Sequence, residues 1–147
     1  EGNPPSFNVC LYNIMNNNNT KTIYSELSIE QLKNLLNNNF VKKHNINIII
    51  IKFSATWCKP CQQIKELSNE LFQKTAENVL CFDLDIDNNN NKKLYSAFKS
   101  KKMIKGVPTL FGFNCKSNRD PEHWYIPDES VSGSSEKDIR RFFLQFG

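Results

Sequence analysis

The chain has 147 residues, which is enough for one compact domain with a single hydrophobic core. Hydrophobic residues make up 39% of it, and its longest apolar run is far too short to cross a membrane. The formal net charge is +4, and most basic residues are interleaved with acidic ones, whereas a nucleic-acid-binding protein needs a denser basic face. We therefore expect no membrane and no nucleic-acid partner, and no segment predicts a signal peptide.

The first half of the chain divides into an extension and the start of a domain. Residues 1–20 are turn-rich and predict an N-terminal extension, in which "FNVCLYNIM" is either one edge strand or a packed tail. Residues 21–147 carry the patterns of the domain. Within them, "TIYSE" predicts a short strand, and "SIEQLKNLLNNN" predicts a helix capped by Ser28. The stretch "INIIIIKFS" is apolar at both sets of alternating positions, which is typical of a strand buried on both faces.

The second half of the chain continues the succession of strands and helices. A helix is predicted after Cys58, with Pro60 in its first turn, where a missing N–H costs little. "NVLCFDLDI" predicts a buried strand, and "NNKKLYSAFKS" predicts a helix. "TLFGFNC" and "HWYIPDESVS" predict a hairpin with a long connection, and "SSEKDIRRFFLQF" predicts a closing helix. The order β-α-β-α-β-α-β-β-α indicates an α/β fold, with a mixed sheet and helices on both of its faces.

Asparagine occurs in runs at 16–19, 37–39 and 88–91. Asn is unfavourable inside helices and strands and is common in turns. We interpret these runs as low-complexity filler in loops and caps.

The most informative local pattern is a Cys-x-x-Cys pair at the exit of a buried strand and the entrance of a helix. The free N–H groups and the dipole of that helix favour a thiolate on Cys58, and thiolate is the nucleophile in disulfide exchange. Cys61 lies one turn further, where it can attack a mixed disulfide and release the product. A zinc site would need four ligands, and neither His44 nor His123 has ligand-like spacing to the pair, so we expect no metal. A purely structural turn is the remaining alternative.

The other three cysteines do not form a framework. An odd and sparse set is unlike a disulfide-stapled secreted scaffold, and it favours a reducing intracellular compartment such as the cytoplasm. We expect Cys81 to be a small buried hydrophobe, and Cys10 and Cys115 to be exposed.

The segments "FSATWCKPC", "FDLDID" and "GVPTLFGF" occur in the order and at the approximate spacing of the thioredoxin family, which the chain resembles over about residues 21–147. The resemblance implies a thioredoxin-like three-layer fold, with a mixed central sheet of four to five strands flanked by about four helices. It also implies dithiol–disulfide exchange at Cys58 and Cys61, with no cofactor. Pro108 is expected to be cis and to face the disulfide, which leaves the neighbouring backbone free to pair with a peptide.

By the same resemblance, Trp57, Val107, Pro108 and Thr109 form the surface that binds substrate. The implied partners are protein disulfide substrates and an upstream disulfide reductase that donates electrons, and we expect a monomer.

Three residues are expected to tune the redox chemistry. Pro60 stands where protein disulfide isomerases carry His, whose cation stabilises the thiolate, so Pro favours the reducing end of the range. Lys59 replaces the commoner Gly and should lower the thiol pKa of Cys58, unless solvent screens its charge. Lys52 stands where the family usually carries a buried Asp that is thought to take a proton from the resolving cysteine. A buried Lys52 either has a lowered pKa or carries its charge to the surface on its long stem.

Together these patterns favour a thiol–disulfide oxidoreductase that reduces protein disulfides. The alternative is a thioredoxin-fold interaction module with weak or specialised redox activity, which the departures at Lys52 and Lys59 and the insert "KSNRDPEHW" favour. A glutaredoxin-like role comes third, because the Tyr of "CPYC" is absent.

A basic cluster, "FKSKKMIK", precedes Pro108. We expect its lysines, Lys99, Lys101, Lys102 and Lys105, to lie on the rim of the site. They either bias partner choice towards acidic surfaces or form an ordinary solvated helix end.

Overall fold

The structure is a computed structural model that describes residues 20–146. The predicted extension, with its possible edge strand and Cys10, therefore lies outside the described residues except for residue 20. In chain order, the elements are β1 (Ile23–Tyr24), α2 (Ile29–Leu35), α3 (Asn38–His44), β2 (Ile48–Ser54), α4 (Lys59–Gln63), α5 (Lys65–Gln73), β3 (Val79–Asp85), α6 (Lys92–Ser100), β4 (Thr109–Asn114), a 3-10 turn (Pro121–His123), β5 (Glu129–Ser132) and α7 (Glu136–Phe146).

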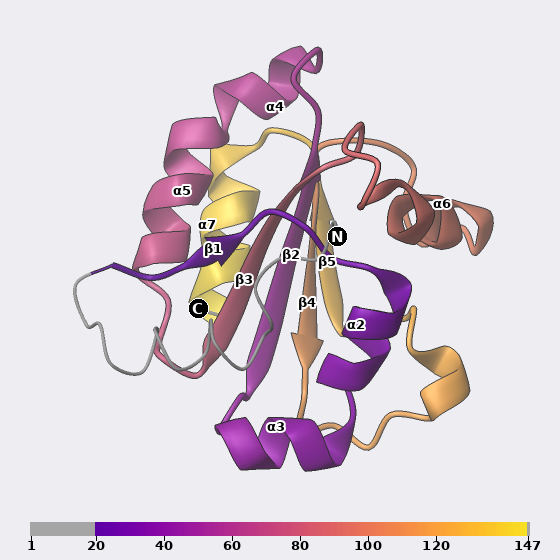
Figure 1. The fold of residues 1–147 in the computed structure, drawn as a ribbon. Coiled ribbons are helices and arrows are strands. Elements are labelled where there is room, and N and C mark those ends of the chain that lie inside the picture. Colours follow the sequence, from indigo (N-terminus) through magenta and orange to yellow (C-terminus); the bar gives the residue numbers. More distant parts are fainter. Residues whose placement is uncertain (1–19, 147) are drawn as a thin grey trace.

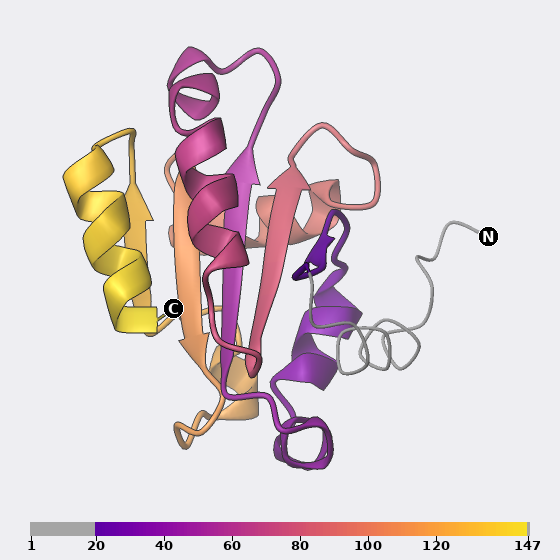
Figure 2. The ribbon, with the colours of Figure 1, turned by 90° about the vertical axis from the view of Figure 1, so that its left-hand side faces the viewer.

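The five strands of the described residues form one mixed sheet in the order β1-β3-β2-β4-β5. The first three are parallel, and β4 and β5 are each antiparallel to the preceding neighbour. Strand β2 lies in the centre, and its whole length pairs with β3 from Ile48 opposite Val79 to Ser54 opposite Asp85. The arrowheads of β2 and β3 point to the end of the sheet from which α4 rises, and that of β4 points away from it (Figure 2).

Helices cover both faces of the sheet, so the domain has three layers (Figures 1 and 2). Ile49, Ile51 and Phe53 of β2 belong to a core that also contains residues of α2, α3 and α6. Ile50 points the other way, into a core shared with α5 and α7. The double-sided apolar pattern of "NIIII" thus has the predicted cause, and the predicted three-layer α/β fold is confirmed.

The described chain has six α-helices where four helical regions were predicted, because the region after Cys58 is divided and α3 lies mostly beyond the helix predicted over 28–39. Ser28 caps α2 as predicted, and it forms a capping box with Gln31. In the run at 37–39, which was expected to lie in a loop or a cap, Asn37 caps the helix α3 by accepting the N–H of Asn39. The helix after Cys58 breaks at Ile64, which ends α4 and begins α5.

The predicted second strand of the hairpin is shorter than "HWYIPDESVS", because only its last four residues form β5. Two prolines explain the difference, since Pro121 begins a 3-10 turn and Pro127 cannot donate to a strand ladder. The connection packs inward instead. The indole of Trp124 is buried and its ring centroid lies 5.6 Å from that of Phe98.

The polar run at 88–91 is not simple filler, because Asn91 is fully buried. Its Oδ1 accepts the backbone N–H of Leu27, and its Nδ2 donates to the carbonyls of Ser25 and Asp85. One amide thereby joins the segment between β1 and α2 to the end of β3. Asn88 and Asn90 add hydrogen bonds to Glu26 from the same loop.

Glycine at 112 in β4 has a packing role. A Cβ at this position would lie 3.0 Å from ring atoms of Phe146, the last residue of α7. The end of α7 therefore rests directly on the strand backbone.

Replacing Asn91 with Ala should lower the free energy of unfolding by about 1–3 kcal/mol, because it leaves the buried N–H of Leu27 without a partner. Urea denaturation of Asn91→Ala measures the loss. The matched control is Asn89→Ala, which changes an exposed residue of the same run and should stay within about 0.5 kcal/mol of the parent. Equal stabilities for Asn91→Ala and the control would contradict the proposed role of the amide.

Candidate active site

The two cysteines of the motif lie where the sequence placed them, at the exit of β2 and the entrance of α4. Cys58 has extended backbone angles and is the N-cap of α4, and its Sγ accepts the N–H of Cys61 at 3.2 Å. The two residues form a disulfide, with Cα atoms 5.2 Å apart. Both are nearly buried, and Pro60 lies in the first turn of the helix as predicted.

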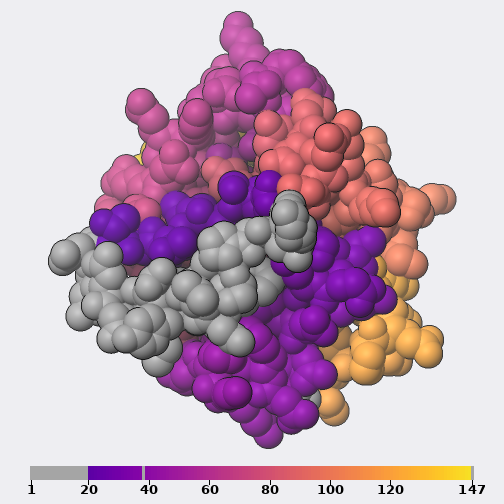
Figure 3. Space-filling model, in the orientation of Figure 1, coloured from indigo at the N-terminus to yellow at the C-terminus, as the bar shows by residue number. Residues whose placement is uncertain are grey.

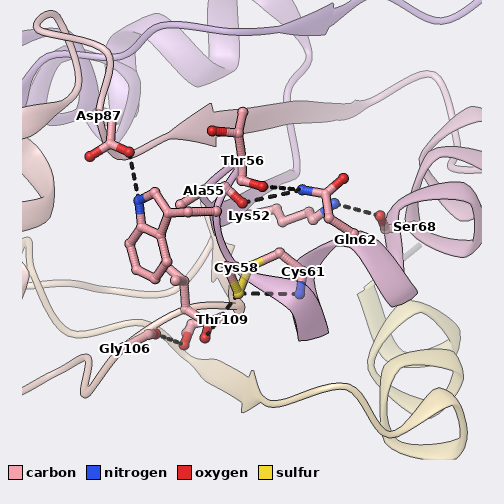
Figure 4. Close-up of a disulfide and its surroundings, with 12 residues drawn as sticks. Lys52, Ala55, Thr56, Cys58, Cys61, Gln62, Ser68, Asp87, Gly106 and Thr109 are labelled. Carbon is pink, nitrogen blue, oxygen red and sulfur yellow. Dashed lines mark hydrogen bonds between the residues drawn. A yellow bond between two sulfur atoms is a disulfide. The ribbon is translucent and has the colours of Figure 1, made fainter.

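The loop between β2 and α4 is tied to the helix by a residue that sequence reasoning missed. The amide of Gln62 donates to the carbonyls of Ala55 and Thr56, at 3.2 and 3.4 Å (Figure 4). Nothing in the letters "WCKPCQ" marks this Gln, because its partners are backbone atoms. The contact holds the turn that presents Cys58.

Trp57 lies on the outside of the site, and 68% of its surface is exposed. Its indole Nε1 donates to the Asp87 carboxylate at 2.8 Å, a contact that the sequence did not reveal (Figure 4). Asp87 follows the end of β3, and β3 ends beside β2 because the two strands are parallel. The exposed ring is held in place by this hydrogen bond.

A second loop reaches the disulfide from the start of β4. The Val107–Pro108 peptide bond is cis, as the resemblance implied. The carbonyl oxygen of Val107 lies 3.7 Å from Sγ of Cys58. Thr109 is buried, and its hydroxyl donates to the carbonyl of Gly106 at 2.7 Å, so this side chain holds the loop and does not face solvent (Figure 4).

Lys52 is buried in β2, and its long stem does not carry the charge to the surface. Only 2% of its side chain is exposed, and Nζ donates to the Ser68 hydroxyl at 2.7 Å (Figure 4). Nζ also lies 3.8 Å from a carboxylate oxygen of Asp83, the residue directly opposite on β3. Burial lowers the pKa of Lys52, and the Asp83 carboxylate opposes that shift. Burial raises the pKa of Asp83, and Lys52 opposes that shift.

The sequence did not predict this pairing, although the signal was present. Lys52 and Asp83 each interrupt an apolar run, in "IIIIKFS" and "VLCFDLD". Two charged residues in neighbouring buried strands become partners only at one register, which the sequence does not specify.

The remaining described cysteines are poor nucleophiles. Burial raises the pKa of Cys81 to about 11 and that of Cys115 to about 12. The expectation that Cys115 is exposed is wrong, because it follows β4 into the core and only 3% of its surface is accessible. Thiolate chemistry in residues 20–146 is therefore concentrated at Cys58 and Cys61.

Lys59 is exposed and lies directly after Cys58, at the start of α4. Within residues 20–146, no three His, Cys, Asp or Glu side chains gather where they could hold a metal ion. In the same residues, no helix is both long and apolar enough to span a bilayer.

Comparisons with known proteins agree with this geometry. The model of the Thioredoxin family matches residues 26–137. The chain is 32% identical over 119 residues to "Thioredoxin 3" of Plasmodium falciparum, covering 79% of this chain and 58% of that protein. It is 28% identical over 91 residues to the chloroplastic M-type thioredoxin of Pisum sativum, covering 62% of this chain and 49% of that protein. The chain thus spans about half the length of these curated relatives.

A solved structure shares the fold at low identity. The crystal structure of Malassezia sympodialis thioredoxin superposes with a TM-score of 0.61 at 19% identity, covering 86% of this chain and 93% of that chain. Because the family model covers most of the sequence and contains the Cys58–Cys61 disulfide, the chain belongs to the thioredoxin family.

Proposed function

We propose that the chain is a thiol–disulfide oxidoreductase that reduces protein disulfides, with Cys58 attacking and Cys61 resolving. One observation carries the assignment of roles. Cys58 is the N-cap of α4, where backbone N–H groups and the helix dipole favour its thiolate, and it adjoins the Val107 carbonyl. Cys61 lies one turn inside the helix and is 1% exposed.

The reaction proceeds in two exchanges. The Cys58 thiolate attacks one sulfur of the substrate disulfide, a mixed disulfide forms, and the other substrate sulfur leaves and takes a proton. Cys61 then loses its proton and attacks Sγ of Cys58, which forms the Cys58–Cys61 disulfide and releases the second substrate thiol. Two electrons have passed to the substrate, and an upstream disulfide reductase restores the dithiol.

The surface around Cys58 supplies the contacts to substrate. Trp57 offers an exposed aromatic face, and the loop at Val107 and Pro108 offers backbone groups for an extended peptide. Thr109 contributes indirectly, by holding that loop. We propose that the chain acts as a monomer, with one site per molecule.

Redox tuning is assigned to Pro60, Lys59 and Lys52. Pro60 provides no cation between the cysteines, which favours a reducing site, and the exposed Lys59 places a cation beside Cys58. Lys52 brings an ammonium into the sheet beneath α4 and α5, and its partner Asp83 brings a carboxylate. In a medium of low dielectric constant, this pair affects the energy of a nearby Cys61 thiolate.

The division of labour predicts that Cys58→Ser abolishes insulin disulfide reduction in the presence of dithiothreitol, while Cys61→Ser accumulates mixed disulfides that it cannot resolve. In the reduced parent, iodoacetamide should modify Cys58 before Cys61, and it should do so at a pH below the ordinary thiol pKa of about 8.5. Cys115→Ala removes a buried thiol and serves as the control, with parental activity. Equal labelling of Cys58 and Cys61 would refute the roles, and full activity in Cys58→Ser would favour the interaction-module alternative.

A role for Lys52 in the proton step predicts that Lys52→Asp remains active with an altered pH profile. The rate of mixed-disulfide resolution is followed by rapid acid quench and alkylation from about pH 6 to 9, the window where perturbed thiols and amines titrate. Lys52→Met, which keeps the length of the side chain without its charge, should raise the apparent pKa of the step because the ammonium no longer favours the thiolate. Profiles that superimpose for all three proteins would exclude Lys52 from the proton step.

The buried pair also predicts a pH-dependent stability. Asp83→Asn leaves the Lys52 ammonium unpaired and should cost about 2–4 kcal/mol in the free energy of unfolding near pH 7. Because burial lowers the pKa of Lys52 in the folded chain, the unfolded chain binds more protons over the window below the ordinary lysine pKa of about 10.4. The free energy of unfolding of the variant therefore rises as the pH is raised through this window.

Urea denaturation at pH 7, 8 and 9 measures how far the free energy of unfolding of Asp83→Asn falls below that of the parent, and this difference is the deficit. The double variant that also carries Lys52→Met should recover part of the deficit, because no buried charge remains unpaired. A deficit that stays constant with pH would show that Lys52 is not the group responsible.

A further inference from the structure

The basic character of the chain is concentrated in one segment. Residues 92–105 contain six lysines and no Asp or Glu. The other 133 residues carry 13 Lys and Arg against 15 Asp and Glu, a net charge of −2. All six side chains belong to exposed residues of α6 and the loop after it. We call this set the α6 lysine surface: Lys92, Lys93, Lys99, Lys101, Lys102 and Lys105.

The charges of this surface are not neutralised within the domain. The basic partners of ion pairs in residues 20–146 are Lys52, Lys74, Arg119, His123, Arg140 and Arg141, and none is a member of the α6 lysine surface. The nearest aromatic rings orient two of the ammonium groups. Those of Lys101 and Lys99 lie 4.4 and 5.9 Å from the ring centroids of Tyr125 and Tyr95.

Helix stability does not account for the whole set. Lys99 lies in the last turn of α6, where a cation is favourable. Lys92 and Lys93 lie in the first turn, where a cation opposes the dipole, and no acidic residue shares that turn. The cap is weak as well, because the amide of Asn91 is engaged with Ser25, Leu27 and Asp85. The sequence thus maintains positive charge at a position where it destabilises the helix.

This surface adjoins the site of thiol exchange. The segment after α6 runs from Lys101 to the cis peptide, and Lys105 is two residues before Val107, whose carbonyl lies 3.7 Å from Sγ of Cys58. The α6 region, coloured salmon, borders the region around α4 in the space-filling view (Figure 3). A protein whose disulfide reaches Cys58 would therefore lie next to these lysines.

We infer that the α6 lysine surface binds an acidic surface of the protein whose disulfide exchanges with Cys58. The inference rests on the proposed function, because the partner is defined by that reaction. Charge complementarity selects the partner: the six unpaired ammonium groups form a surface that continues from Lys105, near the site, along α6, and they attract carboxylates and orient the encounter. A nucleic acid fits less well, because the rest of the chain is net negative and the surface offers no Arg.

The test compares two variants of equal net charge. In the first, the six lysines of the α6 lysine surface become Gln. In the second, six exposed lysines elsewhere become Gln: Lys33, Lys42, Lys43, Lys74, Lys116 and Lys137. Both are assayed for kcat/KM with synthetic peptides that carry the same intramolecular disulfide, flanked by either four Glu or four Ser residues.

The parent should prefer the Glu peptide, and the preference should fall as ionic strength rises from about 20 to 200 mM, where the screening length becomes shorter than about 10 Å. The first variant should lose about tenfold in kcat/KM for the Glu peptide and little for the Ser peptide, which is the size of change that steering produces. The second should keep the preference within about twofold. An unchanged preference in the first variant, or equal losses in both, would overturn the inference.

Two further outcomes are separable. A parent that reduces neither peptide would show that the proposed function is wrong, independently of the lysines. Duplex DNA and phosphatidylserine vesicles are tested as competitors at about 150 mM salt, where the screening length is near 8 Å. If either binds the parent through these lysines while the Glu peptide shows no preference, the partner is not an acidic protein.

Discussion

Strand β2 is paired on both edges and covered on both faces, and the position of the reactive groups follows from this enclosure. Its neighbours are β3 and β4, and Ile49 to Phe53 are almost completely removed from solvent. A chain enclosed in this way can present a side chain to a partner only after the strand ends at Ser54. Because β3 is parallel to β2 and β4 is antiparallel to it, β3 ends and β4 begins at the same edge. Asp87 therefore lies close enough to contact Trp57, and the Val107–Pro108 loop close enough to contact Cys58.

The same enclosure makes Lys52 a costly residue, which explains the detail of its surroundings. A buried ammonium is tolerated only with hydrogen-bond and charge partners, and here Ser68 and Asp83 supply them from α5 and β3. Asp83 keeps 26% of its side chain exposed, whereas Lys52 keeps 2%, so the pair extends from the core to the edge of solvent.

Much of this arrangement is specified by local signals. The run of isoleucines, the Ser28 cap and the four apolar positions of α7 depend on neighbouring residues alone, so the sequence predicts their elements and buried faces correctly. The Cys-x-x-Cys pair belongs to the same class, since its chemistry follows from a strand–helix junction.

Other features depend on contacts between distant residues, and the sequence does not contain them in readable form. In the sequence Asn91 is one more residue of a polar run, because two of its three partners lie more than sixty positions away on the β1–α2 segment. Lys52 with Asp83 is a cross-strand pair, and Trp57 with Asp87 joins the loops that follow the same two strands. The buried position of Cys115 and the inward turn of Trp124 depend on how the long β4–β5 connection folds back over the sheet.

Glycine 112 lets the C-terminal helix α7 pack directly against β4, the strand that follows the Pro108 loop. Because no side chain separates them, the ring of Phe146 presses on the backbone of β4, and that strand starts one residue after Pro108. A side chain at 112 would act as a wedge between helix and strand. The strand on which this ring rests pairs with β2 from Thr109 to Asn114 and with β5 from Thr109 to Gly112. One strand thus carries both the seat of the last turn of α7 and, one residue before its start, the Pro108 loop that faces the disulfide.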